Sequence, residues 1–274
     1  MAFFTVDKNK CSGDGACVAD CPIRILKMDS ELRVPFMIDK GKDLCIRCGH
    51  CVAVCPHGAI SLEDMPVESC RLLQQDWRII PEKLENFLKA RRSIRNYKEE
   101  PVDRKTIESL IDIARFAPSG INRQPARWMI VYEREKVRAL AECVITWMRG
   151  MIEEASPLAE SLHMKNIVTA WEREDDWICR KAPHLVISYA LKDDLTASQA
   201  CTIALTYLEL AAASYGVGAC WAGYVAMAIS MSPYVKKAAG ISDKANCYGA
   251  MMIGYPKFNY SRIPSRNKPH IVWK

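Results

Sequence analysis

A run of four cysteines followed by a proline constrains this chain more than any other stretch. The run consists of Cys45, Cys48, Cys51, Cys55 and Pro56, with gaps of two, two and three residues between the cysteines. Thiolates at these gaps on a turning backbone can converge on three corners of an iron–sulfur cluster, and the last cysteine then serves a second cluster. Core thiols would rarely keep these gaps and add the proline. The spacing therefore predicts that the chain carries single electrons.

The cysteine run has an earlier copy at an offset of 34 residues. The matching positions are Cys11, Cys17, Cys21 and Pro22 in the first copy and Cys45, Cys51, Cys55 and Pro56 in the second. Each copy leads into a short apolar stretch suited to a strand, at Ile25–Leu26 and Ala59–Ile60. Two copies of one unit fold together because neither buries its apolar face alone. Residues 1–65 resemble the two-cluster bacterial ferredoxins over their whole length.

This resemblance implies that each run lends its last cysteine to the other cluster. One 4Fe–4S cluster would be held by Cys21, Cys45, Cys48 and Cys51, and most of the other by Cys11, Cys17 and Cys55. The repeat places Asp14 where its twin has a cysteine, and a carboxylate binds iron more weakly than a thiolate. Asp14 ligates the fourth iron, a water does, or that iron is lost and a 3Fe–4S cluster remains; an empty site with a solvated Asp14 is the alternative. We expect a cluster at both sites, with a labile fourth iron beside Asp14.

Composition limits the class of protein. Half of the 274 residues are hydrophobic and 26% are charged, which is ordinary for a globular chain. We expect no membrane span, because no apolar run reaches about eighteen residues, and no secretion signal. Thirteen cysteines without such a signal indicate a reducing compartment, so we expect a cytoplasmic protein. The net charge of +6 lacks a basic tract with interleaved aromatics, which argues against nucleic-acid binding.

Residues 66–90 form a junction, in which Pro81 suits the first turn of a helix to about Arg92. The following sequence Arg91-Arg92-Ser93-Ile94-Arg95 concentrates guanidinium groups that suit a phosphate, although an exposed basic helix end is the simpler interpretation when it is taken alone. Asp103 can cap a helix with an apolar stripe. That helix ends before a turn-rich loop at 117–125, which leads into a predicted strand, Trp128–Tyr132.

The Arg-Arg-Ser-x-Arg start and the Ala-Pro-Ser-x-x-Asn-x-Gln-Pro loop together resemble the nitroreductase family of FMN-dependent oxidoreductases, over about residues 88–274. The resemblance implies an α+β fold, a central sheet flanked by helices, and a homodimer with FMN at the subunit interface. It implies that the FMN phosphate and ribityl chain are held by Arg91, Arg92, Ser93 and Arg95. It also implies a flavin-lining loop that contributes Pro118, Ser119, Asn122 and Gln124. The domains are thus predicted at 1–65 and 91–274.

The second half of the predicted flavin domain carries further signals. Thr196–Gln199 fits a capping box that opens a helix to about Tyr215, whose alanines suit close approach at a subunit interface. Residues 218–223 match the family strand whose backbone faces the flavin ring, which nominates Cys220, Trp221, Ala222 and Gly223. Core packing of Cys220 and Trp221 is an equal alternative. Ser232 begins a short helix, and Asn246–Tyr255 is a predicted buried strand. The family's C-terminal phosphate-binding turn nominates Arg266 and Lys268.

Residues 134–180 resemble the family least and contain Trp147, His163, Trp171 and Trp177. They could pack over the flavin and shape a substrate pocket, or these aromatics could simply pack in the core. His163 alone does not indicate a general acid. Six cysteines lie outside the cluster runs and are most simply core thiols: Cys70, Cys143, Cys179, Cys201, Cys220 and Cys247.

The sequence therefore predicts an iron–sulfur flavoprotein in which two clusters relay electrons to FMN and FMN reduces a small oxidised substrate, such as a nitro compound or quinone. No side chain is nominated as catalytic. No Gly-x-Gly-x-x-Gly motif opens a strand–helix unit, but this does not exclude NAD(P)H, because the family resemblance implies flavin reduction without such a domain. The fused clusters suggest an external one-electron donor, such as a soluble ferredoxin. The alternatives are an electron-transfer module for a protein partner and a specialised family reaction such as reductive dehalogenation.

Overall fold

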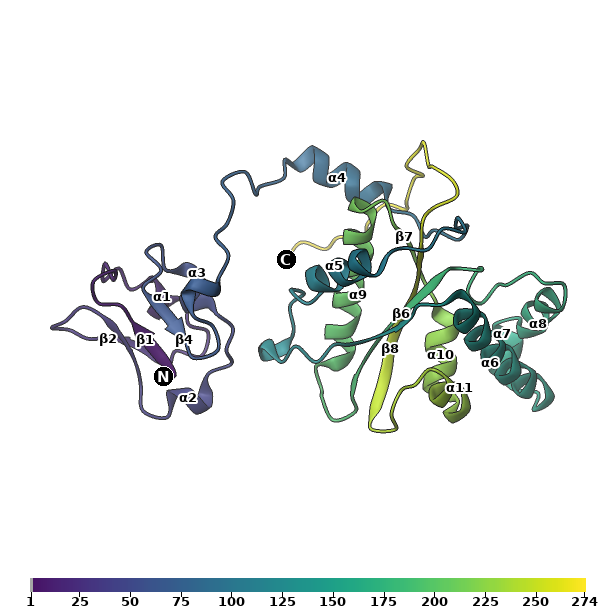
Figure 1. The fold of residues 1–274 in the computed structure, drawn as a ribbon, viewed down its shortest axis with the longest axis horizontal. Coiled ribbons are helices and arrows are strands. Elements are labelled where there is room, and N and C mark those ends of the chain that lie inside the picture. Colours follow the sequence, from purple (N-terminus) through teal and green to yellow (C-terminus); the bar gives the residue numbers. More distant parts are fainter. Residues whose placement is uncertain (1) are drawn as a thin grey trace. The chain divides into compact units, whose positions relative to one another are not determined.

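The computed structural model describes residues 2–274, and the chain forms two compact units (Figure 1). One unit contains the residues up to Ile79 together with Ile121–Arg123. The other contains Ile80–Gly120 and Gln124–Lys274. Within the described residues, no helix has the length and apolar character needed to cross a membrane.

The first unit repeats one small motif. In each copy a glycine in the left-handed region, Gly15 with φ 77° and Gly49 with φ 74°, precedes a short helix and then a strand. Only glycine takes this conformation readily, so these two positions fix where each helix begins. The helices and strands are α1 (Ala16–Ala19), β2 (Leu26–Met28), α3 (His50–Val54) and β4 (Ile60–Leu62). The two strands predicted after the cysteine runs are therefore confirmed.

Strand pairing and core packing join the two copies. β4 pairs antiparallel with β1 (Phe4–Val6), and β2 pairs antiparallel with β3 (Pro35–Met37). The remaining elements are α2 (Gly41–Leu44) and the 3-10 turn η1 (Val67–Ser69). The buried core consists of Phe3, Cys17, Val52, Ile60 and Leu62. Because the core takes residues from both copies, neither copy would bury its apolar face alone.

The second unit is built on a four-stranded antiparallel sheet with the order β5-β6-β8-β7. Its strands are β5 (Arg127–Val131), β6 (His184–Leu191), β7 (Gly218–Trp221) and β8 (Ala245–Gly254). β5 and β8 confirm the two predicted strands to within one residue at each end. β7 lies at one edge of the sheet, which leaves its outer side available to another segment.

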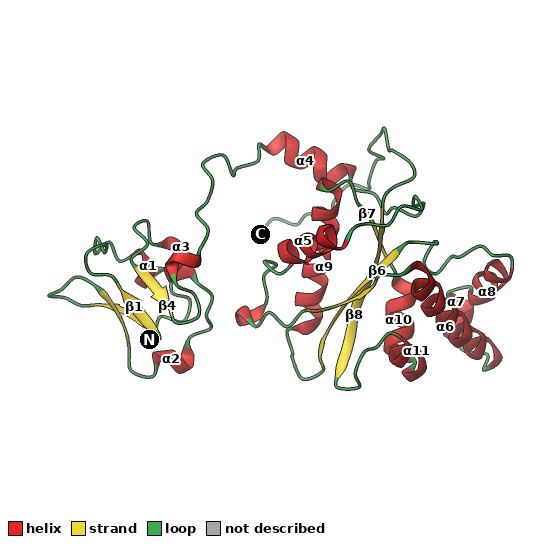
Figure 2. Ribbon diagram, in the orientation of Figure 1, coloured by secondary structure: helices red, strands yellow, loops and turns green. Residues whose placement is uncertain are grey.

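Helices cover both faces of this sheet, as Figure 2 shows. One face packs against α5 (Arg104–Ala114) and α9 (Ala197–Ser214), and the other against α6 (Arg134–Glu153), α10 (Gly223–Met231) and α11 (Pro233–Ala238). Successive side chains of β6 point to opposite faces of the sheet and pack in two separate hydrophobic cores. Val186 packs in the core on the side of α9, whereas Leu185 and Ile187 pack in the core on the side of α6. The predicted central sheet flanked by helices is confirmed. α4 (Pro81–Ala90) precedes the sheet and has no buried residue.

Two of three predicted helix caps form. The Asp103 carboxylate accepts from the amides of Lys105 and Thr106 at the start of α5, and the Ser232 hydroxyl caps α11. The capping box at Thr196 is wrong, because its hydroxyl donates to Asp194 Oδ1 at 2.7 Å instead of capping α9.

The alanines of α9 lie on more than one side of the helix. Ala200, Ala204 and Ala212 are buried within the chain, where they allow α9 to pack closely on its own sheet. Ala211 is partly buried and Ala213 is exposed, and the exposed face also carries Tyr207. The role of this helix at a subunit interface stays a prediction.

The 134–180 segment forms helices α6, α7 (Pro157–Ser161) and α8 (Met164–Glu172). Trp147 and Trp171 are partly buried against the core on this face of the sheet, while Trp177 and His163 are exposed. For the first two tryptophans, this arrangement supports core packing. Four of the six remaining cysteines are buried, as expected of core thiols: Cys179, Cys201, Cys220 and Cys247.

Candidate functional site: two cysteine pockets and a flavin-binding surface

The first unit gathers its cysteines into two separate pockets. The first cysteine pocket is lined by residues that include Cys11, Asp14, Cys17 and Cys55. The second cysteine pocket is lined by residues that include Cys21, Cys45, Cys48 and Cys51. Cys21 and Cys55, the last cysteines of the two runs, have therefore changed places. This is the exchange that the ferredoxin resemblance implied.

The thiols gathered in each pocket suit a cluster, whose protein ligands are spread over several iron atoms. Within the described residues, no group of three or more His, Cys, Asp or Glu could hold one metal ion. Burial, reinforced by the neighbouring Cys45, Cys48 and Cys21, raises the pKa of Cys51 to about 12. The Cys51 thiol is therefore protonated at neutral pH, and the positive charge of bound metal would favour its thiolate.

Asp14 uses both carboxylate oxygens locally. Oδ1 accepts from the Ala16 amide at 2.9 Å, and Oδ2 accepts from the Ser12 hydroxyl at 2.8 Å. These two hydrogen bonds, the backbone one first, hold the pKa of the Asp14 carboxyl below its usual value. The side chain is exposed at the edge of the first cysteine pocket. The pocket thus offers three thiols and one carboxylate that is already hydrogen-bonded, whereas its twin offers four thiols.

In the second unit, the basic segment 91–95 lies along the free edge of β7. The Ile94 amide donates to Ala219 O at 2.9 Å, which extends the sheet by one short pairing. Gly218 is required opposite this contact, because a Cβ there would come within 2.6 Å of the Ile94 side chain. Burial raises the pKa of the Cys220 thiol, and the neighbouring Ser93 side chain opposes this rise. The structure therefore brings together the two segments that the sequence nominated for phosphate and ring.

Arg91 and Arg92 have different surroundings, as alternation along an extended segment requires. The Arg91 guanidinium donates to Glu209 Oε1 at 2.7 Å, and Glu209 Oε2 accepts from the indole of Trp221 at 3.2 Å. Arg92 instead lies over the ring of Tyr260, 6.0 Å from its centroid. Glu209 was not predicted from the sequence. A glutamate on the apolar inward face of an alanine-rich helix was the signal that could have revealed it.

The backbone after β7 offers free amides beside open space. α10 begins at Gly223, and no side chain caps it, because its preceding residue is Ala222. The first amides of a helix have no partner within the helix and carry partial positive charge. A Cβ added at Gly223 would meet no atom within 4 Å. These features fit a planar, electron-rich ring placed against the start of α10, which is the role that the sequence assigned to Ala222 and Gly223.

Comparison with known proteins decides the family. The profile described as "Nitroreductase family" matches residues 88–255, which is more than half of the chain. The chain belongs to the nitroreductase family. The profile of the 4Fe-4S dicluster domain matches residues 10–60, so this nitroreductase carries a ferredoxin-like domain at its N-terminal end. It is an FMN-dependent oxidoreductase by family.

Three individual likenesses cover both parts of this nitroreductase. The crystal structure of an FMN-bound nitroreductase from Bacteroides fragilis is 23% identical, covers 70% of this chain and 100% of that chain, and superposes with a TM-score of 0.58. An iodotyrosine deiodinase of Thermotoga neapolitana is 27% identical over 49% of this chain and 70% of its own length. A protein named ferredoxin 7Fe, from Hydrogenibacillus schlegelii, is 30% identical over 32% of this chain and 99% of its own length.

Two groups of nominated residues in the nitroreductase domain are not joined to this surface within one chain. Ser119 accepts from the Gln124 amide at 2.9 Å, in a loop with two consecutive left-handed residues, Ile121 and Asn122. Arg266 and Lys268 are exposed in the C-terminal segment after β8. Among the described residues, Arg266 and Lys268 make no hydrogen bond or ion pair, whereas Arg91 is already paired with Glu209.

A cavity of about 730 Å³ lies beside Arg91 and Arg92, between α4, the end of α9 and the start of β7. Its volume is in the range of cofactor sites. Phe87 of α4 and Tyr260 of the C-terminal segment also line it, and both side chains remain partly exposed. This cavity gives the basic segment access to a molecule the size of FMN.

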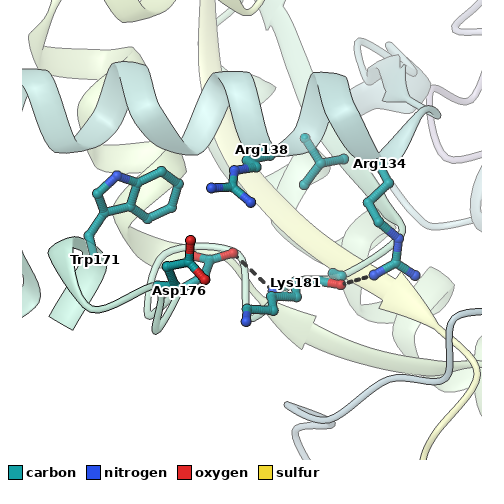
Figure 3. A pocket seen from close by; sticks show the side chains of 8 residues that line it. Arg134, Arg138, Trp171, Asp176 and Lys181 are labelled. Carbon is teal, nitrogen blue, oxygen red and sulfur yellow. Dashed lines mark hydrogen bonds between the residues drawn. The ribbon is translucent and has the colours of Figure 1, made fainter.

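A second cavity of the nitroreductase domain, about 130 Å³, lies between α6, α8 and the loop after α8 (Figure 3). Arg134 donates to the carbonyls of Lys181 at 2.8 Å and Glu99 at 3.1 Å. The buried Asp176 accepts from the Lys181 amide at 2.9 Å, and Trp171 forms a side wall. Arg134 and Asp176 thus hold the loop, and the volume is too small for a flavin.

Proposed function

We propose that this nitroreductase is an iron–sulfur flavoprotein that takes single electrons into its cysteine pockets and reduces a small oxidised compound, such as a nitro compound or a quinone, at FMN. One observation carries the proposal: a complete pair of cysteine pockets belongs to the same chain as the basic segment paired with β7. When bound, the clusters would carry one electron at a time and FMN would exchange one electron or two. Such a combination links a one-electron donor to a two-electron reduction.

Each cluster would be held by the first cysteines of one run and the last cysteine of the other run. Cys21, Cys45, Cys48 and Cys51 would hold a 4Fe–4S cluster, and Cys11, Cys17 and Cys55 would hold the second cluster. The name of the seven-iron ferredoxin relative supports one four-iron and one three-iron cluster, for which these seven cysteines suffice. Asp14, already hydrogen-bonded to Ala16, would then stay off the metal or bind a fourth iron weakly.

On the flavin side, Arg91, Ser93 and Arg95 would hold the phosphate and ribityl chain, because guanidinium groups bind phosphate through forked donors. The first amides of α10 would stabilise negative charge on the ring. Pro118, Ser119, Asn122, Gln124, Arg266 and Lys268 would complete the site as residues of a homodimer with FMN at its interface. The exposure of Arg266 and Lys268 supports this assignment, since phosphate-binding side chains must be accessible.

Anaerobic stopped-flow spectroscopy tests the proposal by comparing reduction of the bound flavin by NADH, NADPH and reduced ferredoxin. We expect ferredoxin to reduce the flavin fastest, and the reduced protein to turn over repeatedly with nitroaromatic compounds or quinones. A protein purified without flavin, or clusters that never exchange electrons with it, would contradict the proposal. Reduction without small-molecule turnover would instead favour an electron-transfer module for a protein partner.

Reductive dehalogenation is a second candidate, favoured by the likeness to an iodotyrosine deiodinase. The same reduced protein should then release halide from halogenated phenols faster than it consumes nitroaromatic compounds. Ion chromatography of the released halide distinguishes the two reactions.

A further inference from the structure

Glu209 is one of four buried polar or charged side chains in the described part of the chain, with 7% of its surface exposed. It lies on α9, whose other inward residues are apolar or small. Both carboxylate oxygens are used: Oε1 accepts from Arg91 Nη1 at 2.7 Å, and Oε2 accepts from Trp221 Nε1 at 3.2 Å. The carboxylate therefore connects the start of the basic segment with the end of β7.

Packing alone does not account for this glutamate. Taking a carboxylate out of water is unfavourable unless it is paired and hydrogen-bonded, and a buried ion pair is often replaced by apolar residues without loss of stability. Leu205 and Leu208 show that α9 accommodates leucine on the same face. Ion pairs between exposed side chains, such as Arg149 with Glu172, are of a different kind, because water solvates both partners when they separate.

We propose that Glu209 is a positioning residue for cofactor binding, which fixes Arg91 and Trp221 together so that the phosphate end and the ring end of the site keep one geometry. The inference rests on the proposed FMN site. A guanidinium group has five N–H donors, so Arg91 retains donors for a phosphate while Nη1 is held by Glu209. Trp221, which is 37% exposed, is held by its indole nitrogen. Glu209 thus acts through Arg91 and Trp221 and does not touch the cofactor.

The substitution Glu209→Gln tests this role, because it keeps the shape of the side chain and removes its charge. Arg91 and Trp221 donate to different oxygens of Glu209, and in glutamine one of these oxygens is replaced by an NH2 group, which cannot accept. We expect the dissociation constant of FMN, measured by quenching of flavin fluorescence on the apoprotein, to rise about tenfold, as for loss of one charge-assisted hydrogen bond. Glu172→Gln is the matched control, because it removes an exposed glutamate paired with Arg149 in the same domain and should leave FMN affinity unchanged.

A double-mutant cycle with Arg91→Gln separates positioning from general stability. Because Glu209 acts partly through Arg91, Glu209→Gln should weaken FMN binding clearly less in the Arg91→Gln background than in the unchanged chain. A merely structural glutamate would lower the melting temperature and add its effect on affinity unchanged in both backgrounds. Glu209→Leu provides a second variant, expected also to bind FMN about tenfold more weakly. Because it leaves Arg91 without its buried partner, its folding is checked by thermal unfolding.

Unchanged or tighter FMN binding by Glu209→Gln, or additive effects in the cycle, would overturn the positioning role while leaving the proposed function standing. Absence of FMN binding by the unchanged chain would overturn the proposed function and this inference together. The two failures are therefore distinguishable from one titration series on the full-length protein.

Discussion

The cysteine pockets and the proposed flavin-binding surface differ in how far apart their residues lie in the sequence. Each cysteine pocket is lined by residues that lie within one unit and within about fifty positions of sequence. The flavin surface joins residues 91–95 to residues 218–223, more than a hundred positions later, through the edge of β7. Arg266 and Lys268 are exposed beyond β8 and have no partner among the described residues. The proposed metal sites thus follow from local spacing, whereas the proposed flavin site depends on sheet topology and, in the proposed homodimer, on residues that this surface does not include.

Replacing Cys21 by alanine should have the largest effect and tests the exchange of cysteines directly. Cys21 belongs to the first run but lines the second pocket, so its loss should remove the signal of the reduced 4Fe–4S cluster in electron paramagnetic resonance. Cys70→Ala is the control, since Cys70 lies in the same unit but in neither pocket. A normal four-iron signal in Cys21→Ala would break the comparison, because the pockets would then not be built from exchanged cysteines.

Asp14→Cys sharpens the contrast between the two pockets. A fourth thiolate in the first pocket should raise iron from about seven to about eight atoms per chain, as both pockets would then offer four cysteines. Iron analysis of anaerobically purified protein measures this change. Asp14→Ala is the companion variant: unchanged iron shows that the carboxylate does not ligate, whereas a loss shows that it does. About eight irons in the unchanged protein would contradict the expected asymmetry.

Arg266→Ala tests whether the flavin surface draws on the C-terminal segment. Loss of a charge-assisted pair to the FMN phosphate should weaken binding by about 1.5–3 kcal/mol. Flavin titration of the apoprotein measures the loss, and iron content should stay constant because both cysteine pockets lie in the other unit. Arg262→Ala, an exposed arginine of the same segment, is the control. Equal FMN retention in Arg266→Ala would remove this residue from the site.

His184 should make the stability of the second unit depend on pH. Burial lowers the pKa of His184, whose Nε2 accepts from the Val102 amide at 2.9 Å. Below about pH 6.5 the unfolded chain binds a proton that the folded chain binds less readily, so stability is full above this pH and falls as pH drops through the lower folded-state pKa. Denaturant unfolding at about pH 7.5 and about pH 5.5 measures the slope.

The variant His184→Ala should lose this slope and also lose about 1–3 kcal/mol, because the buried Val102 amide loses its acceptor. His163→Ala is the matched control, since His163 is exposed in the same unit. A pH slope that persists in His184→Ala would assign the acid sensitivity to other groups.

The features that could be predicted from the sequence alone are those that depend on residues a few positions apart. Asp103 and Ser232 cap their helices because a short polar side chain can reach amides two or three residues ahead, and both caps form. At Thr196 the same reasoning failed, because the Thr196 hydroxyl donates to the carboxylate of Asp194, two residues earlier, and does not accept from an amide of α9. A cap can be predicted only when no closer acceptor competes for it.

Contacts between residues that are far apart in the sequence could not be predicted from the spacing of motifs. The pairing of Ile94 with Ala219 depends on which strand ends the sheet, and the sequence does not state this order. Alternation along residues 91–95 does predict that Arg91 and Arg92 point apart, but it names no partner for either. Glu209 becomes visible only when α9 is placed beside β7. The resemblance to the family supplied the segments, and the fold supplied their contacts.

The exchange of Cys21 and Cys55 has a consequence for how the protein matures. Each cysteine pocket is lined by the last cysteine of the opposite half, so neither pocket is complete while the other half is unfolded. If the clusters bind as proposed, acquisition of iron and closure of the small unit would become a single cooperative event. Protein made under iron shortage would then consist of fully empty and fully loaded copies, with few that hold a lone cluster.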